Sequence, residues 1–506
     1  MQNGDQPLTV PNDQTSDGAP PRAFGFETRA VHAGHRPDPA TGASALPIFQ
    51  TSAFVFEDTD TAAAYFNLQE YGNIYTRIMN PTVAAFEERI ANLEGGAGAV
   101  AFGSGLAAQA AALYTLLQPG DHLVASQAIY GGSIAQFKHV LKKLSVEVTL
   151  VDPDDADAWR AALRPTTKAL FAETIGNPGG NVLDIEMVAG VAHTHGTPLI
   201  VDNTFATPYL CRPIEWGADI IVHSATKFID GHGASIGGVV VESGRFDWSN
   251  GRFAIIAAPS EEYHGLAFHE TFGMYGYLMK LRAETLRDLG ASLSPFNAFL
   301  FALGLETLPV RMERHVANAH TVARYLEGHP MVERVRYAGL PGNAYHASAR
   351  KYLPRGAGSV FAFDLRGDRV VGQRFIEALT LWSHLANVGD TKSLVIHPAS
   401  TTHRQLSDSE LAATGVAPGT IRLSVGLESV DDLLWDLERA LQVAARAAGH
   451  ADLTRPAQPQ VSSSSPPLPP AVGRGASAGT VGPGSPSPRK ERGTGGEDIR
   501  ATEVAR

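Results

Sequence analysis

Two ionisable side chains follow apolar runs of the sequence and could form a chemical site. Lys227 follows the apolar run Ile220–His223 and lies in a loop rich in Gly and Ser, and Asp202 follows the run Leu199–Val201. Taken alone, Lys227 is equally well explained as a surface or salt-bridged lysine, and Asp202 is better explained as a helix cap. Together they supply the amine and the carboxylate with which proteins bind an aldehyde cofactor that has a basic ring nitrogen. A carboxylate about 4 Å from such a nitrogen contributes on the order of 4 kcal/mol at an effective dielectric constant of about 20.

A glycine-rich segment offers a phosphate site. Residues 103–108 (GSGLAA) have the pattern G-x-G-x-x-A and precede a helical run. A nicotinamide dehydrogenase would also need an acidic residue about twenty positions on, at the end of the next strand. That strand, 122–125, ends instead at Ser126 and Gln127. What remains is a helix N-terminus whose N–H groups can bind one phosphate.

The pair His193 and His195 has the spacing of metal ligands. Because we expect no carboxylate or thiolate partner near them, we interpret the two histidines as part of a polar helix face and predict no metal site.

The composition limits the class of partner. The chain has 506 residues, of which 44% are hydrophobic and 18% charged, and its formal net charge is −11. Its length predicts two packed domains, and its negative charge disfavours nucleic acid and anionic membranes. No apolar run approaches the roughly 20 residues that span a bilayer, and the first twenty residues do not resemble a secretion signal. Since Cys211 is the single cysteine, nothing requires an oxidising compartment, and we expect a cytoplasmic protein with a small-molecule ligand.

Short apolar runs alternate with amphipathic stretches, which is typical of a mostly parallel sheet covered by helices. One helix is well marked: Asn80 can be its N-cap, Pro81 fits the first turn, and Gly95 can end it after an apolar face formed by Val83, Phe86, Ile90 and Leu93. The predicted strands of the sheet are residues 99–102, 122–125, 146–151, 169–173, 199–201, 220–223 and 237–241.

After about residue 265 the pattern changes to long helices and isolated strands, predicted at 332–337, 359–364, 394–396 and 421–425. We therefore predict a disordered segment 1–23, an N-terminal arm 24–75, a large cofactor-binding α/β domain 76–265, a smaller α+β domain 266–450 and a disordered Pro/Ser/Gly-rich tail 451–506.

The polar residues noted above share one position relative to the predicted strands. Gly103–Gly105, Asn177, Asp202 and Ser224–Lys227 each come shortly after a strand. Ligands of open α/β sheets bind outside the carboxyl ends of the strands, so these residues are expected to converge on one crevice.

The same residues resemble the Cys/Met-metabolism family of pyridoxal-phosphate enzymes, and the resemblance runs from about Glu27 to Ala447. It implies a fold of the type I aminotransferase class, with a seven-stranded sheet sandwiched by helices and a smaller C-terminal α+β domain. The motifs that carry it are YTR-x-x-NP at 75–81, SGLA at 104–107, YGG at 130–132, ET-x-GNP at 173–178, VDNTF at 201–205, SATK at 224–227 and RLSVGLE at 422–428.

The resemblance also implies roles for individual residues. Lys227 would hold pyridoxal 5'-phosphate as a Schiff base and carry protons, and Asp202 would pair with the ring nitrogen. Tyr130 would stack on the ring and assist proton transfer, and Asn177 would lie near the ring hydroxyl and the substrate. Arg422 would bind the substrate carboxylate through two hydrogen bonds.

The resemblance implies that backbone groups, hydroxyls and residues of a partner subunit hold the phosphate. The active unit would then be a homo-oligomer, a dimer or a tetramer, with shared active sites. The residues implied are Gly105 and Leu106 through their backbone, Ser224 and Thr226 through their hydroxyls, and Tyr75 and Arg77 from a neighbouring subunit.

Two stretches, 264–273 and 387–403, resemble the O-acetylhomoserine sulfhydrylase branch, and Gly132 stands where methionine γ-lyases typically carry a cysteine. The implied reaction is a γ-replacement in methionine biosynthesis that converts O-acetylhomoserine and sulfide, or a thiol, to homocysteine or its analogue and acetate. Cystathionine γ-synthase and methionine or cystathionine γ-lyase are alternatives within the family, and a cofactor-binding scaffold protein is the alternative outside enzymes. The sequence leaves open the acyl group, the sulfur donor, the oligomer size and any role of the tail.

Overall fold

The structure is a computed structural model of the chain that describes residues 24–177, 179–401 and 417–450. The predicted disorder of residues 1–23 and 451–506 concerns segments outside these ranges. All described residues fall within one compact unit, so the boundary predicted near residue 265 stays a prediction.

A seven-stranded sheet forms the centre of the fold, in the order β1-β7-β6-β5-β4-β2-β3. Six strands run in one direction, and β7 is antiparallel to both of its neighbours. The predicted mostly parallel seven-stranded sheet is therefore confirmed. Its strands are β1 (Gly98–Phe102), β2 (His122–Ser126), β3 (Glu147–Val151), β4 (Thr167–Glu173), β5 (Leu199–Asp202), β6 (Ile220–His223) and β7 (Gly238–Glu242).

The reversal at β7 follows from the segment before it. Parallel neighbours need a long crossover connection, usually a helix. Residues 224–237, which join β6 to β7, contain no helix, so the chain turns back beside the strand it has just left. This loop includes Ser224–Lys227.

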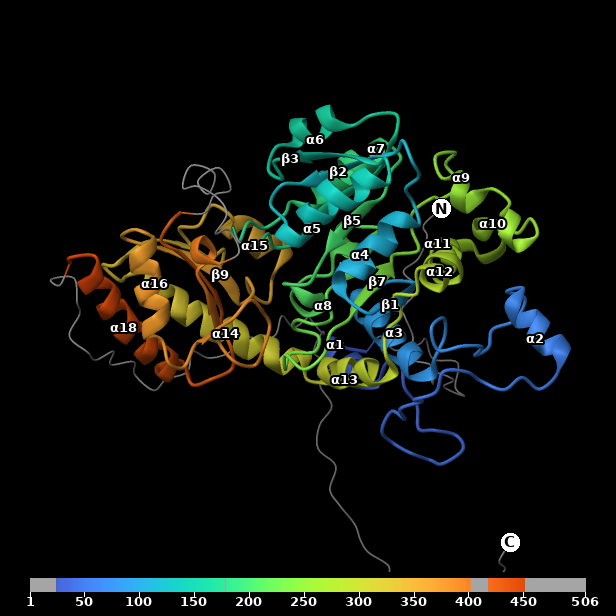
Figure 1. Cartoon of the computed structure of the whole chain (residues 1–506), viewed down its shortest axis with the longest axis horizontal. Coiled ribbons are helices and arrows are strands. Elements are labelled where there is room, and N and C mark those ends of the chain that lie inside the picture. The colour runs from blue at the N-terminus through green and yellow to red at the C-terminus, as the bar shows by residue number, and fades with distance from the viewer. Residues whose placement is uncertain (1–23, 178, 402–416, 451–506) are drawn as a thin grey trace, which may run out of the picture. The chain divides into compact units, whose positions relative to one another are not determined.

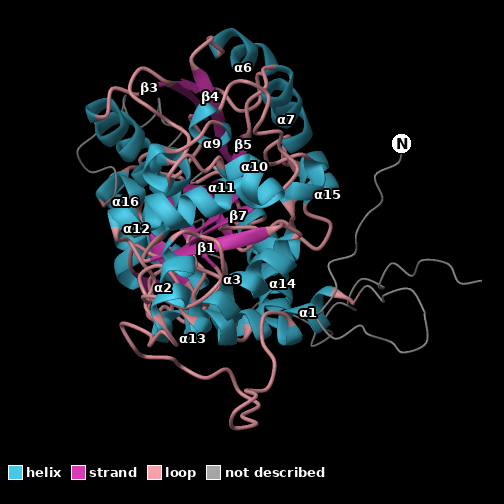
Figure 2. Ribbon diagram, turned by 90° about the vertical axis from the view of Figure 1, so that its right-hand side faces the viewer, coloured by secondary structure: helices cyan, strands magenta, loops and turns pink. Residues whose placement is uncertain are grey.

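Helices cover both faces of the sheet (Figures 1 and 2), with α3 and α13 on one face and α10 and α11 on the other. Buried side chains alternate between two apolar clusters, as Val201 and Ile200 show, because successive residues of a strand point to opposite faces. The helices are α1 (Phe26–His32), α2 (Thr59–Phe66), α3 (Pro81–Glu94), α4 (Gly105–Tyr114), α5 (Gly131–Ala135), α6 (Ala156–Ala162), α7 (Ile185–Thr194), α8 (Thr207–Leu210), α9 (Ala254–Ala257), α10 (Phe268–Phe272), α11 (Gly276–Lys280), α12 (Arg287–Leu289), α13 (Pro295–Glu306), α14 (Leu308–Glu327), α15 (His346–Tyr352), α16 (Arg369–Ala378) and α18 (Val430–Ala447).

Helix α3 has the ends that its sequence predicts. The side chain of Asn80 accepts a hydrogen bond from the Thr82 N–H at 2.9 Å, Pro81 is the first helical residue, and Gly95 ends the helix with a φ of 80°. A side chain with a Cβ would be strained at that angle. The helix therefore stops at Glu94, whose side chain is fully buried.

A second sheet of five strands has the order β10-β11-β12-β9-β8 and is antiparallel except for the β10–β11 pair. Helices α14, α16 and α18 surround it (Figure 1). Four of its strands were predicted, whereas β10 is too short to give a readable alternation. The strands are β8 (Val332–Arg336), β9 (Val360–Leu365), β10 (Ser383–His384), β11 (Leu394–Ile396) and β12 (Thr420–Ser424).

The segment around α2 stands clear of the helices that cover the sheet in Figure 1. Its large apolar side chains are exposed, including Val55, Phe66 and Tyr71. Among the described helices, none is both long and apolar enough to cross a membrane.

Candidate active site

A cavity of about 310 Å³ opens at the carboxyl ends of the central strands and reaches the second sheet. Nine of the eleven predicted site residues line it. They are Gly105, Leu106, Tyr130, Asn177, Asp202, Ser224, Thr226, Lys227 and Arg422. The sheet-edge rule predicted that those which follow a strand, from Gly105 to Lys227, would converge, whereas Leu106, Tyr130 and Arg422 were implied by the family resemblance.

The N-terminus of α4 forms one end of the cavity. Ser104 caps this helix by accepting a hydrogen bond from the Ala107 N–H at 3.1 Å, and the first N–H groups of a helix have no partner within it. A Cβ at Gly105 would lie only 2.6 Å from the Ser224 Cβ. The glycine is therefore required for the helix end and the Ser224 loop to meet, and this junction places backbone N–H groups beside a hydroxyl, as an anion requires.

The hydroxyl of Thr226 lies at the same end but is already engaged. Its Oγ1 donates to the Gly237 carbonyl and accepts from the Gly237 N–H, both at 3.1 Å. To bind a ligand, this hydroxyl must either accept a hydrogen bond with its remaining lone pair or rotate away from the Gly237 carbonyl and donate.

Two carboxyl groups stand side by side at the ends of β4 and β5, where the buried Glu173 and the half-buried Asp202 are register partners. Asp202 Oδ1 accepts a hydrogen bond from the Thr204 N–H at 2.9 Å. Glu173 Oε1 accepts one from the N–H of Tyr130 at 2.7 Å. Burial, and then the charge of Asp202, hold the pKa of Glu173 well above its usual range. Sequence reasoning gave Glu173 no role, although it ends a strand as Asp202 does.

Lys227 projects into the cavity from the loop after β6. Its Nζ donates a hydrogen bond to Asn387 Oδ1 at 2.5 Å. Burial, and then the charge of Arg422, lower the pKa of the amine. Gly389 allows this approach, because its φ is +79° and a Cβ there would lie 2.7 Å from the Phe228 N. Asn387 was missed as a site residue, although it opens the stretch 387–403 that distinguishes the branch.

Arg422 reaches the cavity from β12 of the second sheet. Its guanidinium donates to Asn177 Oδ1 and to the Asn387 carbonyl, each at 3.3 Å. Burial lowers the pKa of the guanidinium to about 10, so the group is still cationic at pH 7. Within the described ranges, no carboxylate pairs with it at salt-bridge distance. A buried cation without an anion is suited to an anionic ligand.

Tyr75 and Arg77 do not line the cavity of their own chain. The ring of Tyr75 is 42% exposed, and the Arg77 guanidinium lies 5.5 Å from its centroid. Arg77 Nη1 also donates to the Arg287 carbonyl. Their action across a subunit interface stays a prediction.

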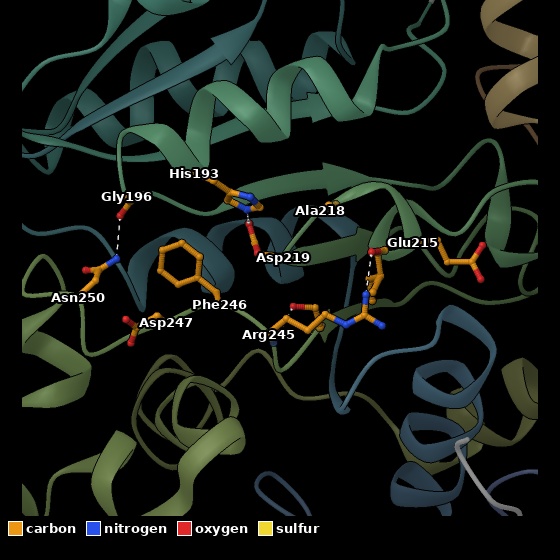
Figure 3. Close-up of a pocket in the computed structure, with 12 residues that line it drawn as sticks. His193, Gly196, Glu215, Ala218, Asp219, Arg245, Phe246, Asp247 and Asn250 are labelled. Atoms are coloured by element: carbon orange, nitrogen blue, oxygen red, sulfur yellow. Dashed lines mark hydrogen bonds and ion pairs between the residues drawn. The ribbon is translucent and has the colours of Figure 1, made fainter. Parts of the chain in front are cut away.

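A second hollow, of about 440 Å³, lies at the opposite edge of the sheet, around the residues that precede β5 and β6 (Figure 3). There His193 Nε2 lies 2.9 Å from Asp219 Oδ2, so the expectation that this histidine has no carboxylate partner was wrong. His195 Nε2 lies 2.9 Å from the Arg164 carbonyl. No group of three or more His, Cys, Asp or Glu side chains that could hold a metal occurs in the described part of the chain.

The residues around the first cavity fit pyridoxal phosphate. A helix end and Ser224 can receive the phosphate, Asp202 has an oxygen left for a ring nitrogen, and Lys227 and Arg422 line the same cavity. The hollow of Figure 3 contains no lysine among its lining residues. The geometry therefore favours the first cavity as the cofactor site.

Two known proteins are similar to this chain over most of its length. The O-acetyl-L-homoserine sulfhydrylase of Leptospira meyeri is 48% identical to this chain over 431 residues, which cover 83% of this chain and 98% of that protein. The homocysteine synthase of Schizosaccharomyces pombe is 49% identical over 422 residues, with coverages of 83% and 98%.

A solved structure shows the same fold. The putative O-acetylhomoserine (thiol)-lyase of Campylobacter jejuni matches with a TM-score of 0.80 and 41% identity, over 83% of this chain and 100% of that one. That crystal structure contains N'-pyridoxyl-lysine-5'-monophosphate. The profile of the Cys/Met metabolism PLP-dependent enzymes matches residues 27–442, which decides between the pyridoxal-phosphate and nicotinamide interpretations: the chain belongs to the Cys/Met metabolism family of PLP-dependent enzymes.

Proposed function

We propose that this enzyme catalyses γ-replacement on O-acetylhomoserine, in which sulfide displaces acetate and homocysteine is formed. The observation that carries the proposal is that one cavity holds a lysine of lowered pKa, the half-buried carboxylate of Asp202 and a buried arginine that has no carboxylate partner among the described residues. The relatives named for this reaction support the choice of substrate.

The cofactor, when bound, withdraws electrons from the substrate carbons and so makes their protons removable. The residues of the chain bind and orient the cofactor. We assign Asp202 to its ring nitrogen and the face of Tyr130 to its ring. Asn177 is assigned to its hydroxyl, and the phosphate is assigned to a set formed by Gly105, Leu106, Ser224 and Thr226. Among these, Thr226 is the weakest donor, because Gly237 already engages its hydroxyl.

Lys227 is proposed to move the protons. An amine acts as a base only in its neutral form, and burial together with the charge of Arg422 lowers the pKa of this amine. After the substrate amine takes its place, Lys227 can remove a proton from Cα, release it, and then remove one from Cβ, so that acetate leaves Cγ. Sulfide, losing a proton, then bonds to Cγ, and Lys227 can return protons to Cβ and Cα. Asn387, 2.5 Å away, gives the amine a fixed position within the cavity. Tyr130 assists these transfers.

Arg422 is proposed to bind the substrate carboxylate. Its donors have a planar, forked geometry that matches a carboxylate in two places. Arg422 comes from the second sheet, whereas Lys227 comes from the first. A substrate whose carboxylate is bound by Arg422 would therefore contact residues of both sheets.

We also propose a homodimer or a pair of dimers as the active unit, with Tyr75 and Arg77 acting on the phosphate of the neighbouring subunit. Support comes from the exposure of apolar side chains around α2 and from the position of both residues outside their own cavity. A cytoplasmic location is part of the proposal, and it is supported by the single buried cysteine, Cys211.

A product assay tests the proposal. The enzyme with pyridoxal phosphate is given O-acetylhomoserine or O-succinylhomoserine, each with sulfide, methanethiol or cysteine, and the amino-acid products are identified. Homocysteine from the acetyl ester and sulfide is the expected main product. A preference for cysteine would indicate cystathionine γ-synthase, and formation of a 2-oxo acid without a thiol would indicate a γ-lyase.

A further inference from the structure

A buried polar cluster lies directly behind the strand ends that line the cavity. It consists of Glu94, Thr174, Asn203 and His223, each with 0% of its surface exposed. Glu94 is the last residue of α3, His223 is the last residue of β6, and the other two follow β4 and β5. The proposed reaction uses none of these side chains, although burying four polar groups is costly unless they are paired.

The Glu94 carboxylate is the centre of this cluster. Its Oε1 lies 2.6 Å from His223 Nε2 and accepts a hydrogen bond from Asn203 Nδ2 at 2.8 Å. Asn203 Oδ1 in turn accepts from the Thr174 hydroxyl at 2.8 Å. One side chain of α3 therefore ties together the ends of three neighbouring strands.

Three members of the cluster are the immediate chain neighbours of residues in the cavity. Thr174 follows Glu173, Asn203 follows Asp202, and His223 precedes Ser224. Successive side chains along a strand point to opposite faces. A displacement of any of these strand ends within the cluster would therefore displace its neighbour in the cavity.

Two atoms of the cluster, Glu94 Oε2 and His223 Nδ1, have no hydrogen-bond partner in the part of the chain that the structure describes. The imidazole of His223 therefore depends on its contact with Glu94 for pairing. Loss of the Glu94 carboxylate would remove that contact and one of the hydrogen bonds of Asn203 together.

We propose that Glu94 is a positioning residue of the cofactor site: through Asn203 it fixes the strand end that presents Asp202, and through His223 it fixes the strand end that leads to Ser224 and Lys227. The inference rests on the proposed function, because the partner of Asp202 is taken to be the ring nitrogen of pyridoxal phosphate.

A double-mutant cycle tests it. Glu94→Gln, His223→Gln and the double variant are prepared without cofactor and titrated with pyridoxal phosphate. Each single change is expected to weaken binding roughly 10- to 100-fold, the size found for groups that orient a metal ligand from behind. Because Glu94 acts in part through His223, the two losses should be less than additive.

The pH titration of the visible band of the bound cofactor gives a second readout. With Asp202 displaced from the ring nitrogen, that nitrogen holds its proton less firmly and withdraws less charge from the nitrogen that links the ring to Lys227. The midpoint of the titration should therefore move to higher pH in both single variants. A purely structural role would leave this midpoint unchanged.

Glu242→Gln is the matched control. Glu242 is also a fully buried carboxyl, at the opposite edge of the same sheet, and it accepts a hydrogen bond from Trp248 Nε1 at 2.7 Å. This variant is expected to keep the cofactor affinity and the titration midpoint of wild type, whatever its stability. Glu94→Gln behaving like Glu242→Gln, or strictly additive losses in the cycle, would overturn the inference.

If Glu94→Gln and His223→Gln do not fold, Thr174→Val decides the matter. It removes the one hydrogen bond from Thr174 to Asn203, and a loss of cofactor affinity of about three- to ten-fold is expected; unchanged affinity would refute the proposed coupling. Failure of the wild type to bind pyridoxal phosphate would instead refute the proposed function, and this inference with it.

Discussion

Removing Arg422 should damage substrate binding and leave cofactor binding intact. Its two hydrogen bonds, to Asn177 and to the Asn387 carbonyl, are long at 3.3 Å, and no carboxylate among the described residues would be left unpaired by Arg422→Ala. We therefore expect Arg422→Ala to have little effect on the stability of the folded protein. The substrate carboxylate, however, would be buried without its cation, which costs about 2 to 5 kcal/mol.

At about 1.4 kcal/mol for each factor of ten, this cost predicts that kcat/KM for the acylhomoserine falls roughly thirty-fold to several thousand-fold in Arg422→Ala. The visible band of the cofactor should persist. Arg422→Lys should recover only part of the loss, because an ammonium supplies charge without the forked geometry.

Arg334→Ala is the control for this experiment. Arg334 belongs to the same sheet, its side chain is 63% exposed, and Arg336 maintains a second bridge to the same partner, Asp364. Catalysis should be unchanged, and stability should change by no more than about 1 kcal/mol. Near-normal kcat/KM in Arg422→Ala, or loss of its cofactor, would show that the assignment is wrong.

Three further predictions concern the cofactor, the interface and the sheet. Lys227→Ala should lose the visible absorbance band of the bound cofactor together with activity, and a variant that keeps the band would contradict the role of this lysine. Mixing Arg77→Ala with Lys227→Ala should restore some activity through hybrid dimers, and no recovery between subunits shown to exchange would argue against a shared site. Burial raises the pKa of Glu242 from 4.5 to about 8, so the folded state holds a proton that the unfolded state releases between those values. The stability of wild type should therefore fall as pH rises from about 4.5 to about 8, thermal unfolding of Glu242→Gln should show a smaller decline, and equal slopes would contradict this pKa.

The sequence was sufficient for the sheet and for the helix that starts at Pro81. The seven strands of the first sheet are short and mostly apolar, because helices cover both faces, and their bounds in the structure differ from the predicted ones by at most two residues. Asn80 and Gly95 predicted the ends of α3 because each has a local physical reason to stand there. The two-residue strand β10 could not be found in this way, since it exists only through its pairing with β11.

Site residues that directly follow a strand could be predicted from the sequence. Those brought to the site by contacts between distant segments could not. Asp202 and Lys227 could be placed at one edge of the sheet by topology alone. Asn387 reaches Lys227 from a segment 160 residues further along the chain, and no local pattern encodes that distance. The carboxylate of Asp219 beside His193 escaped prediction for the same reason, since the contact joins the C-terminal turn of α7 to the residue before β6.

The division of charge between Glu173 and Asp202 also depends on contacts that the sequence does not show. Both end a strand, Glu173 buried and Asp202 half-buried, and two adjacent carboxylates cannot both ionise without a large cost. Burial raises the pKa of both carboxyls, and the charge of Asp202 raises that of Glu173 further, to well above its usual range. Hydrogen bonds from Thr204 oppose the effect of burial on Asp202. Glu173, whose Oε1 accepts the N–H of Tyr130, is therefore the member of the pair that more readily keeps its proton, and Asp202 is the member that we propose for the ring nitrogen of the cofactor.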